Sequence, residues 1–231
     1  MKKTVLITGC TKGIGHAVAK KLLYSEGYEI YGIARQAQTS DLKKEHPSVK
    51  LYDCDLSDPY ETEKVLRTIL DDSSGIDVVI NNAGIGNFKP IDQLTLADWS
   101  AVLNVNLTAP YLVIHHVLPH MKQQNFGKII TISSDADHLS FTDASAYCAS
   151  KAGLSSLADC VRKEVSGYNI TVTTIAPGRV DTNFNHKKPG DRPNSLRAED
   201  IAEQVAFLLT LPERCEIEKI YLNSILEKEL H

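Results

Sequence analysis

The chain has 231 residues, of which 42% are hydrophobic and 23% are charged, and its formal net charge at pH 7 is −4. These values are typical of a folded globular protein and exclude a disordered chain, and the length provides a core for one domain without disulfides or structural metal. Because the balance is acidic and no Lys/Arg run exceeds a pair, nucleic acids and anionic membranes are not expected partners.

The cysteines and the N-terminus bear on the compartment of the protein. Five cysteines are scattered without a Cys-x-x-Cys pair, which favours reduced thiols and no metal site. The apolar run that follows Lys2 and Lys3 reaches a glycine loop too soon for a signal peptide, and no stretch approaches the roughly 20 apolar residues of a membrane-spanning helix. We therefore expect a cytoplasmic protein.

Short apolar runs rich in β-forming residues alternate with longer helical patterns along the chain. The predicted strands are Val5–Thr8, Tyr28–Ala34, Val49–Tyr52, Ile76–Ile80, Lys128–Ser133, Ile170–Ile175 and Ile217–Leu222. The predicted helices lie near residues 14–26, 58–72, 95–122, 145–166 and 198–210. This alternation predicts an α/β fold with a parallel sheet covered by helices on both faces, in one domain over residues 1–231. The turn-rich segment Asn183–Ser195 is predicted to form a short substrate flap.

A glycine-rich segment joins the first predicted strand to the first predicted helix. It reads Thr8-Gly9-Cys10-Thr11-Lys12-Gly13-Ile14-Gly15. Glycines there allow the backbone to approach a pyrophosphate, which the free N–H groups at the start of the helix attract. A tight turn without a ligand uses the same residues, so this motif alone leaves both interpretations open.

Further motifs follow in order along the chain: Asn81-Asn82-Ala83-Gly84, Ser134, Tyr147-x-x-x-Lys151, and Pro177-Gly178 with Thr182. Together with the Gly-x-x-x-Gly-x-Gly spacing of the loop, they resemble the short-chain dehydrogenase/reductase family from about Lys3 to Leu211. The resemblance implies a single doubly wound Rossmann-type domain with a seven-stranded parallel sheet. It also implies reversible hydride transfer between a nicotinamide ring and a carbonyl or alcohol.

Tyr147 and Lys151 are four residues apart, so on a helix they share one face. A cation within roughly 4–6 Å favours the phenolate form of a tyrosine, and Lys151 is therefore expected to tune Tyr147 as an acid/base. In carbonyl reduction Tyr147 would donate a proton to the developing alkoxide while Ser134 hydrogen-bonds the same oxygen. The resemblance assigns these roles and also places Lys151 on the nicotinamide ribose.

The resemblance adds an asparagine that holds a water in the proton relay. Asn104 and Asn106 compete for this role, and Asn106 is chosen because the family's asparagine directly precedes a leucine-like position, here Leu107. Ser133 competes similarly with Ser134. The family's serine lies 13 residues before the tyrosine, which selects Ser134.

The cofactor type is predicted from the end of the second strand, where Ala34 is followed by Arg35 and no acidic residue is available for a free ribose 2′-hydroxyl. Lys12 occupies a position from which similar family members reach a 2′-phosphate. Both cations favour NADP(H), although solvated surface charges would look the same in sequence. Asp55 and Leu56 resemble the pair that contacts adenine. By the resemblance the other cofactor-binding residues are Gly9, Thr11, Gly13, Ile14, Gly15, Asn82, Ala83, Gly84, Tyr147, Lys151, Pro177, Gly178, Val180 and Thr182.

Two features are not interpreted as chemistry. His116 and His120 have a spacing that can hold a metal on a helix, with His115 beside them, but Pro119 is predicted to break that helix and no acidic ligand is adjacent. No metal site is therefore predicted. Cys10 is interpreted as a small residue that fills the loop and not as a reactive thiol.

The substrate is not named by the sequence, because specificity depends on loops that vary on one scaffold. The segment after the predicted catalytic serine contains three polar residues, Asp135, Asp137 and His138. They either select a polar or cationic substrate or face water. The loops expected to line the pocket are 85–93, 135–145 and 179–196.

The resemblance implies an NADPH-dependent carbonyl reductase. The sequence Leu211-Pro212-Glu213 is similar to the subgroup that acts on small 3-hydroxy acids and serine-like compounds, whereas the tail Glu216–Ser224 lacks the paired glycines of many members. Reduction of 3-oxoacyl thioesters is the other candidate reaction. An NADPH-sensing scaffold without turnover is disfavoured because all four tetrad positions are filled.

Two helical segments bear on assembly. Leu107–Met121 is apolar around most of its circumference, and Ser145–Val165 carries small residues that permit close approach of another helix. We therefore expect a homodimer that packs these helices across a two-fold axis, with a homotetramer as the alternative.

Overall fold

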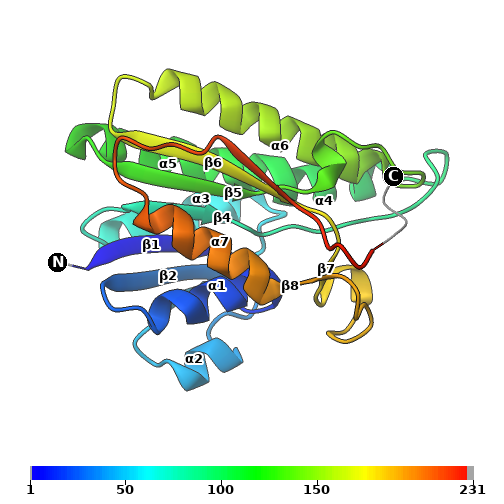
Figure 1. Ribbon diagram of the computed structural model, residues 1–231, viewed down its shortest axis with the longest axis horizontal. Helices are drawn as coiled ribbons and strands as arrows, with labels where there is room; N and C mark the ends of the chain where they lie inside the picture. The colour runs from blue at the N-terminus through cyan, green and yellow to red at the C-terminus, as the bar shows by residue number, and fades with distance from the viewer. Residues whose placement is uncertain (1, 228–231) are drawn as a thin grey trace.

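The computed structural model describes residues 2–227, and its centre is one parallel sheet with the strand order β3-β2-β1-β4-β5-β6-β9 (Figure 1). The strands are β1 Lys3–Thr8, β2 Tyr28–Ala34, β3 Lys50–Asp53, β4 Val78–Asn81, β5 Gly127–Ile132, β6 Ile170–Pro177 and β9 Lys219–Leu222. The predicted α/β fold with a seven-stranded parallel sheet is confirmed. The order reverses between β1 and β4, and this switch point opens a crevice at the carboxyl ends of the strands.

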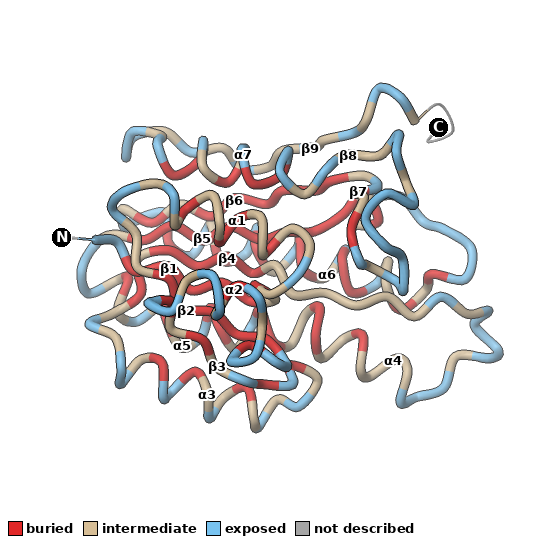
Figure 2. The backbone as a smooth tube through the Cα atoms, turned by 90° about the horizontal axis from the view of Figure 1, so that it is seen from below, coloured by how far each residue is buried: buried red, intermediate tan, exposed pale blue. Residues whose placement is uncertain are grey.

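The helices cover both faces of the sheet. They are α1 Gly13–Leu23, α2 Asp41–Glu45, α3 Pro59–Asp72, α4 Leu96–Leu103, α5 Ala109–Gln124, α6 Ser145–Glu164 and α7 Ala198–Thr210. Side chains alternate along each strand, so Val5 and Ile7 of β1 pack with α1 and α7 while Leu6 packs with α3, α5 and α6. Figure 2 shows buried positions concentrated in the strands and in the helix turns that face them.

Several short elements were not predicted from sequence. Helix α2 has five residues and begins after Ser40, whose side chain accepts a hydrogen bond from the Lys43 backbone N–H. Strands β7 (Val180–Asp181) and β8 (Leu196–Arg197) form a separate parallel pair of two residues each. This pair closes the base of the segment predicted to be a flap.

The structure differs in two ways from the single long helix predicted over residues 95–122. A π-helical turn over Asn104–Thr108 separates α4 from α5, and α5 continues through Pro119 to Gln124. The prediction that Pro119 breaks this helix is therefore wrong. Proline removes one N–H and leaves one carbonyl, that of His115, without its helical partner, and both residues lie on the exposed face where water serves the carbonyl.

The combined run Leu96–Gln124 is long and apolar enough to cross a membrane by length and composition alone, which corrects the expectation that no such stretch exists. Within its most apolar window 44% of the residues are buried inside the protein. Val113 and Val117 are fully buried against the sheet. We therefore assign this run to the core of the fold.

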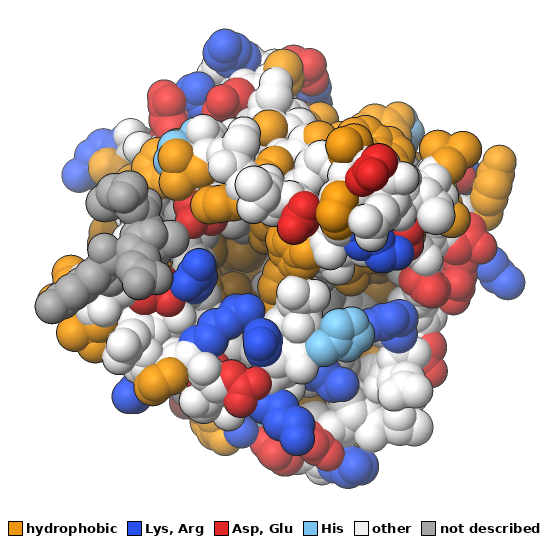
Figure 3. All heavy atoms as spheres, turned by 90° about the vertical axis from the view of Figure 1, so that its right-hand side faces the viewer, with side chains coloured by type: hydrophobic (Ala, Val, Ile, Leu, Met, Phe, Trp, Pro, Cys, Tyr) orange, Lys and Arg blue, Asp and Glu red, His pale blue; other side chains and the backbone are white. Residues whose placement is uncertain are grey.

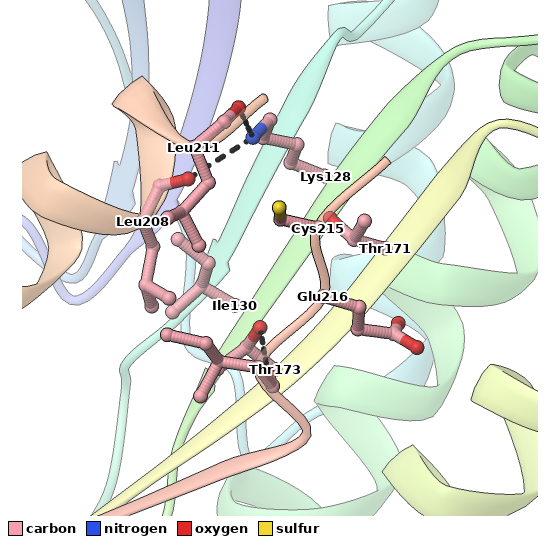
Figure 4. A pocket seen from close by; sticks show the side chains of 9 residues that line it. Lys128, Ile130, Thr171, Thr173, Leu208, Leu211, Cys215 and Glu216 are labelled. Carbon is pink, nitrogen blue, oxygen red and sulfur yellow. Dashed lines mark hydrogen bonds between the residues drawn. The ribbon is translucent and has the colours of Figure 1, made fainter. Parts of the chain in front are cut away.

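Lys128 on β5 is an unusual buried cation beneath α7. Its ammonium donates to the Leu208 carbonyl at 3.0 Å and the Leu211 carbonyl at 3.3 Å (Figure 4). These carbonyls lie at the C-terminal end of α7, where a cation is favourable, and the Leu208 carbonyl also accepts from the Leu211 backbone N–H at 3.4 Å. The contact fixes the exit of the chain toward β9.

Candidate active site

The crevice is a cleft of about 1150 Å³ at the carboxyl ends of the strands. Figure 3 views this side, where a central hollow has hydrophobic side chains at its floor and lysine and arginine side chains along one side. All the residues predicted to bind the cofactor or act in catalysis line this cleft except Gly15 and Asn106. The fold thus brings together motifs that lie up to 173 residues apart in sequence, from Gly9 to Thr182.

The glycine loop is shaped for close approach of a ligand. Gly9 and Gly13 have φ of 69° and 54°, in the left-handed region that favours glycine. A Cβ at Gly15 would collide with the Gly9 carbonyl oxygen and the Asn82 amide. That amide donates to the carbonyls of Thr8 at 2.8 Å and Gly9 at 3.2 Å, which ties the loop to the end of β4.

The same loop leaves a place for an anion. Helix α1 begins at Gly13 without a hydrogen bond from a side chain at its N-cap, so its first N–H groups face the cleft uncapped. Such a helix end attracts a pyrophosphate. The observed loop conformation therefore fits a dinucleotide.

Two cationic side chains line the cleft, one in the glycine loop and one directly after β2. Arg35 and Lys12 line the cleft, are exposed, and form no ion pair with the residues that the structure describes. Hydrogen bonds from the Ser57 backbone and side chain lower the pKa of Asp55, and the charge of Arg35 lowers it further. Leu56 is buried beside Asp55 and offers an apolar surface for a base.

Helix α6 presents Tyr147 and Lys151 to the cleft. The Lys151 ammonium donates to the Ile132 carbonyl at 3.0 Å and lies 5.8 Å from the centre of the Tyr147 ring. Burial lowers the pKa of Lys151 to about 8. Burial also raises the pKa of Tyr147 to about 12, against the lowering effect of a hydrogen bond with Ser134.

The expectation that Lys151 lowers the pKa of Tyr147 is therefore not met in this arrangement. Tyr147 is half-buried and desolvation is the largest effect on the pKa of its phenol, whereas the Lys151 ammonium is turned toward the Ile132 carbonyl. A raised pKa keeps the phenol protonated at neutral pH. Tyr147 is consequently poised to donate a proton.

Asn106 lies in the π-helical turn and is fully buried. Its amide donates to the Ile85 carbonyl at 2.9 Å and to Ser150 Oγ at 3.0 Å, and its oxygen accepts from the Ile85 N–H at 2.9 Å. Ser150 in turn donates to the Tyr147 carbonyl at 2.7 Å, so Asn106 adjoins the turn of α6 that carries the tyrosine. Asn104 instead donates to the Ser57 carbonyl at 2.9 Å, away from that turn.

The two competing serines also differ in position. Ser134 Oγ donates to Asp135 Oδ1 at 2.7 Å and accepts from the Ala136 N–H at 3.2 Å, and Ser134 lines the cleft together with Tyr147. Ser133 Oγ points behind α6, where it donates to the Lys151 carbonyl at 3.4 Å. Ser134 is therefore the serine beside the phenol.

Comparisons with known proteins agree with this geometry. A family model described as short chain dehydrogenase matches residues 3–193. The chain belongs to the short-chain dehydrogenase family. It is an NAD(P)-dependent oxidoreductase that acts on CH–OH groups, as the resemblance implied.

Several family members are similar over nearly their whole length. A serine 3-dehydrogenase from Agrobacterium fabrum is 29% identical over 241 residues, which cover 97% of this chain and 95% of the relative. The closed form of a serine dehydrogenase complexed with NADP+ superposes with a TM-score of 0.89 at 26% identity, covering 99% of this chain and 97% of that one. A metagenomic short-chain oxidoreductase in complex with NADP gives 0.82 at 31% identity, covering 95% and 96%.

Two aromatic residues in the cleft of this short-chain dehydrogenase, Phe88 and Phe184, were not predicted from the sequence as site residues. The rings of Phe88 and Phe184 each lie 5.6 Å from the Tyr147 ring, and 6.4 Å from one another. They belong to loops predicted to line the pocket, and an aromatic residue in so polar a loop is the signal that identifies them. Asp98 anchors the first loop through hydrogen bonds from Asn87 at 2.7 Å and Lys89 at 2.8 Å.

The segment Asn183–Ser195 contributes four residues to the cleft wall: Asn183, Phe184, Asn185 and Arg192. Asn185 and His186 both adopt positive φ, 56° and 60°, in a short 3-10 turn. The segment thus lies beside the tyrosine. Its role as a substrate flap stays a prediction.

The structure separates the three polar residues that follow Ser134. Asp135 lines the cleft, whereas Asp137 turns inward and its side chain is fully buried. Asp137 accepts from Lys219 at 2.6 Å, Ser155 at 2.5 Å and His138 at 2.7 Å. Asp137 thus neither faces water nor reaches the substrate, and it joins β9 to the back of α6.

The remaining candidates give no second centre. Burial raises the pKa of the Cys10 thiol to about 12, consistent with a residue that fills the loop. His116 lies 3.6 Å from Glu63, and residues 2–227 contain no group of three side chains suited to hold a metal.

A first prediction concerns the buried Asp137–Lys219 pair. Burial raises the pKa of Asp137, but hydrogen bonds from Lys219, Ser155 and His138 outweigh it and hold the pKa below its ordinary value. Lys219→Met should lower the free energy of unfolding at pH 7 by about 1.5–3 kcal/mol. A carboxyl group whose pKa is lower in the folded than in the unfolded protein stabilises the fold at pH values above its unfolded pKa, and this stability is lost as Asp137 becomes protonated. The difference in unfolding free energy between Lys219→Met and wild type should therefore shrink below about pH 4.

The measurement is urea unfolding between pH 3 and pH 8. Lys163→Met is the control, because Lys163 on α6 is exposed and forms no ion pair in the described chain. An equal loss for both variants, or a difference independent of pH, would contradict the assigned pair.

Proposed function

We propose that this short-chain dehydrogenase transfers a hydride between NADP(H) and a small alcohol or carbonyl substrate, with Tyr147 as the proton donor in reduction. The observation that carries the proposal is the convergence of Ser134, Tyr147 and Lys151 at the mouth of the glycine-loop cleft, with the phenol kept protonated by burial. When bound, the nicotinamide supplies or accepts the hydride. The protein's own residues then handle the proton.

Each residue of the tetrad has a role that follows from its contacts. Tyr147 donates its proton to the developing alkoxide, and Ser134 orients the same oxygen by a hydrogen bond. The Lys151 ammonium is buried beside the Ile132 carbonyl, and its remaining N–H groups are available to a ribose and to the proton relay. Asn106 fixes the Ile85 backbone and Ser150 on either side of that relay.

NADP(H) is proposed over NAD(H) because Arg35 and Lys12 line the adenosine end of the cleft without ion-pair partners in the described chain. A 2′-phosphate would supply the missing anion. The NADP-bound relatives support the same choice.

For the substrate we propose a small 3-hydroxy acid. The similarity to serine 3-dehydrogenases over 97% of the chain supports this class. Reduction of a 3-oxoacyl thioester remains the second candidate, because the cleft is large enough for either.

The tetrad is tested by Tyr147→Phe, which removes the proton donor but keeps the ring. Turnover should fall by roughly 10²–10⁴, the usual contribution of a general acid, while cofactor affinity stays near wild type. Steady-state kinetics and cofactor titration measure the two quantities separately. Tyr168→Phe, a change at an exposed remote tyrosine, is the control, and undiminished turnover of Tyr147→Phe would refute the proton-donor role.

Cofactor preference is tested at Arg35. Charge-assisted hydrogen bonds contribute about 1.5–3 kcal/mol each, so Arg35→Ala should reduce the preference for NADPH by about 10–100-fold and leave the use of NADH almost unchanged. Combining it with Ala34→Asp should favour NADH, because the carboxylate accepts from a free 2′-hydroxyl and repels a phosphate. The comparison is kcat/KM with each cofactor, with Arg214→Ala as control. A wild type that prefers NADH contradicts the assignment.

We also propose the homodimer through α5 and α6. The chain itself buries Ile114 to 4% exposure, so this side chain is not part of the proposed contact. The outer face nevertheless exposes 47% of Tyr111, and α6 exposes the small residues Ala149, Ala152 and Ser156. These small residues permit close approach of a second helix.

Light scattering tests the dimer. Tyr111→Glu and Ser156→Glu should convert a wild-type dimer to monomers, because each places a charge in the contact. Tyr60→Glu, on the distant exposed face of α3, should leave the mass unchanged. A monomeric wild type at micromolar concentration would disprove this assembly.

A further inference from the structure

Asp135 is a carboxylate placed beside the reacting position. It directly follows Ser134, lines the cleft, and accepts the Ser134 hydroxyl proton at 2.7 Å. A substrate oxygen held by the serine would lie about 2.8 Å from Ser134 Oγ, the usual distance for hydroxyl hydrogen bonds. That oxygen is therefore within roughly 5.5 Å of the Asp135 carboxylate, the sum of these two distances.

Asp135 has no ion-pair partner in the part of the chain that the structure describes. No lysine, arginine or histidine among residues 2–227 forms an ion pair with it, whereas Asp137, two residues later, is paired with Lys219 and His138. The charge also acts on its surroundings, since it raises the pKa of Tyr147. A positively charged group of a ligand in the cleft would be attracted to this carboxylate and would form a charge-assisted hydrogen bond with it.

The other side of this position is aromatic. The centres of the Phe88 and Phe184 rings each lie 5.6 Å from the centre of the Tyr147 ring and 6.4 Å from one another. Phe141 also lines the cleft. Aromatic faces exclude water and attract a cation, but they cannot neutralise an anion. One carboxylate and several ring faces together favour a compact cationic group.

We propose that Asp135 binds an ammonium group on the carbon next to the reacting one, so that the preferred substrates are 2-ammonio alcohols and the matching 2-ammonio carbonyl compounds. This inference rests on the proposed function and specifies its substrate. In a 1,2-amino alcohol the nitrogen lies about 3 Å from the hydroxyl oxygen, and it therefore comes within reach of a carboxylate located as Asp135 is. A 3-oxoacyl thioester has no such cation.

Matched pairs of substrates test the proposal. Threonine and 3-hydroxybutyrate differ only by the ammonium group, as do serine and 3-hydroxypropanoate. With NADP+, the wild type should show a higher kcat/KM for the ammonium member of each pair, and Asp135→Asn should reduce that ratio by about 10–100-fold, the loss of one charge-assisted contact. Asp143→Asn, a neighbouring acid that does not line the cleft, should leave the ratio unchanged.

Other outcomes overturn the proposal in distinguishable ways. Equal kcat/KM within each pair, or a ratio that Asp135→Asn does not change, would disprove the ammonium site. The proposed function would still hold in that case, provided that the enzyme turns over with NADP+. If Asp135→Asn instead changes only the relative affinity for NADP+ and NADPH, measured by fluorescence titration, the carboxylate serves the cationic oxidised nicotinamide and not the substrate. Absence of turnover with every pair, in both directions, counts against the proposed function itself.

Discussion

The placement of the half-buried Tyr147 and the buried Lys151, one helical turn apart on α6, is the constraint on which the rest of the site depends. An ammonium withdrawn from water needs an oxygen, and the Ile132 carbonyl at the end of β5 supplies it at 3.0 Å. Ser134, just beyond the end of β5, lines the same cleft as the phenol. Helix α6 must therefore dock its first turns against the carboxyl end of β5, and the cleft forms where these two elements meet.

Structures on both sides of α6 hold that docking in place. The π-helical turn widens the helix between α4 and α5, and in this turn Asn106 is buried with all its polar atoms bonded to Ile85 and Ser150. Behind α6, the buried Asp137–Lys219 pair joins the turn after Ser134 to β9. The charge of Asp137 also opposes the lowering of the Lys151 pKa by burial. The tail beyond α7, which departs from the family pattern, thus supports the catalytic turn.

The sheet could be predicted because its signals are local, whereas the positions of the proposed tetrad came from the resemblance to the family. β-branched runs specify the strands, glycines specify the left-handed loop, and a four-residue spacing places Tyr147 and Lys151 on one face. The π-helical turn, the inward direction of Asp137 and the packing of Phe88 and Phe184 on the tyrosine depend on contacts between distant segments. The same is true of the balance between burial and charge at Tyr147, where the sequence shows the lysine but not the loss of water.

The central claim is that burial, and not the nearby ammonium, sets the protonation of Tyr147 and keeps it a proton donor. Carbon-13 NMR of cofactor-free protein labelled at tyrosine Cζ measures this directly, with the Tyr147 resonance assigned by its absence in Tyr147→Phe. The account predicts that this resonance stays at the phenol position up to about pH 10, where an unperturbed tyrosine is half ionised. A Tyr147 resonance that moves to the phenolate position below that pH would contradict the account.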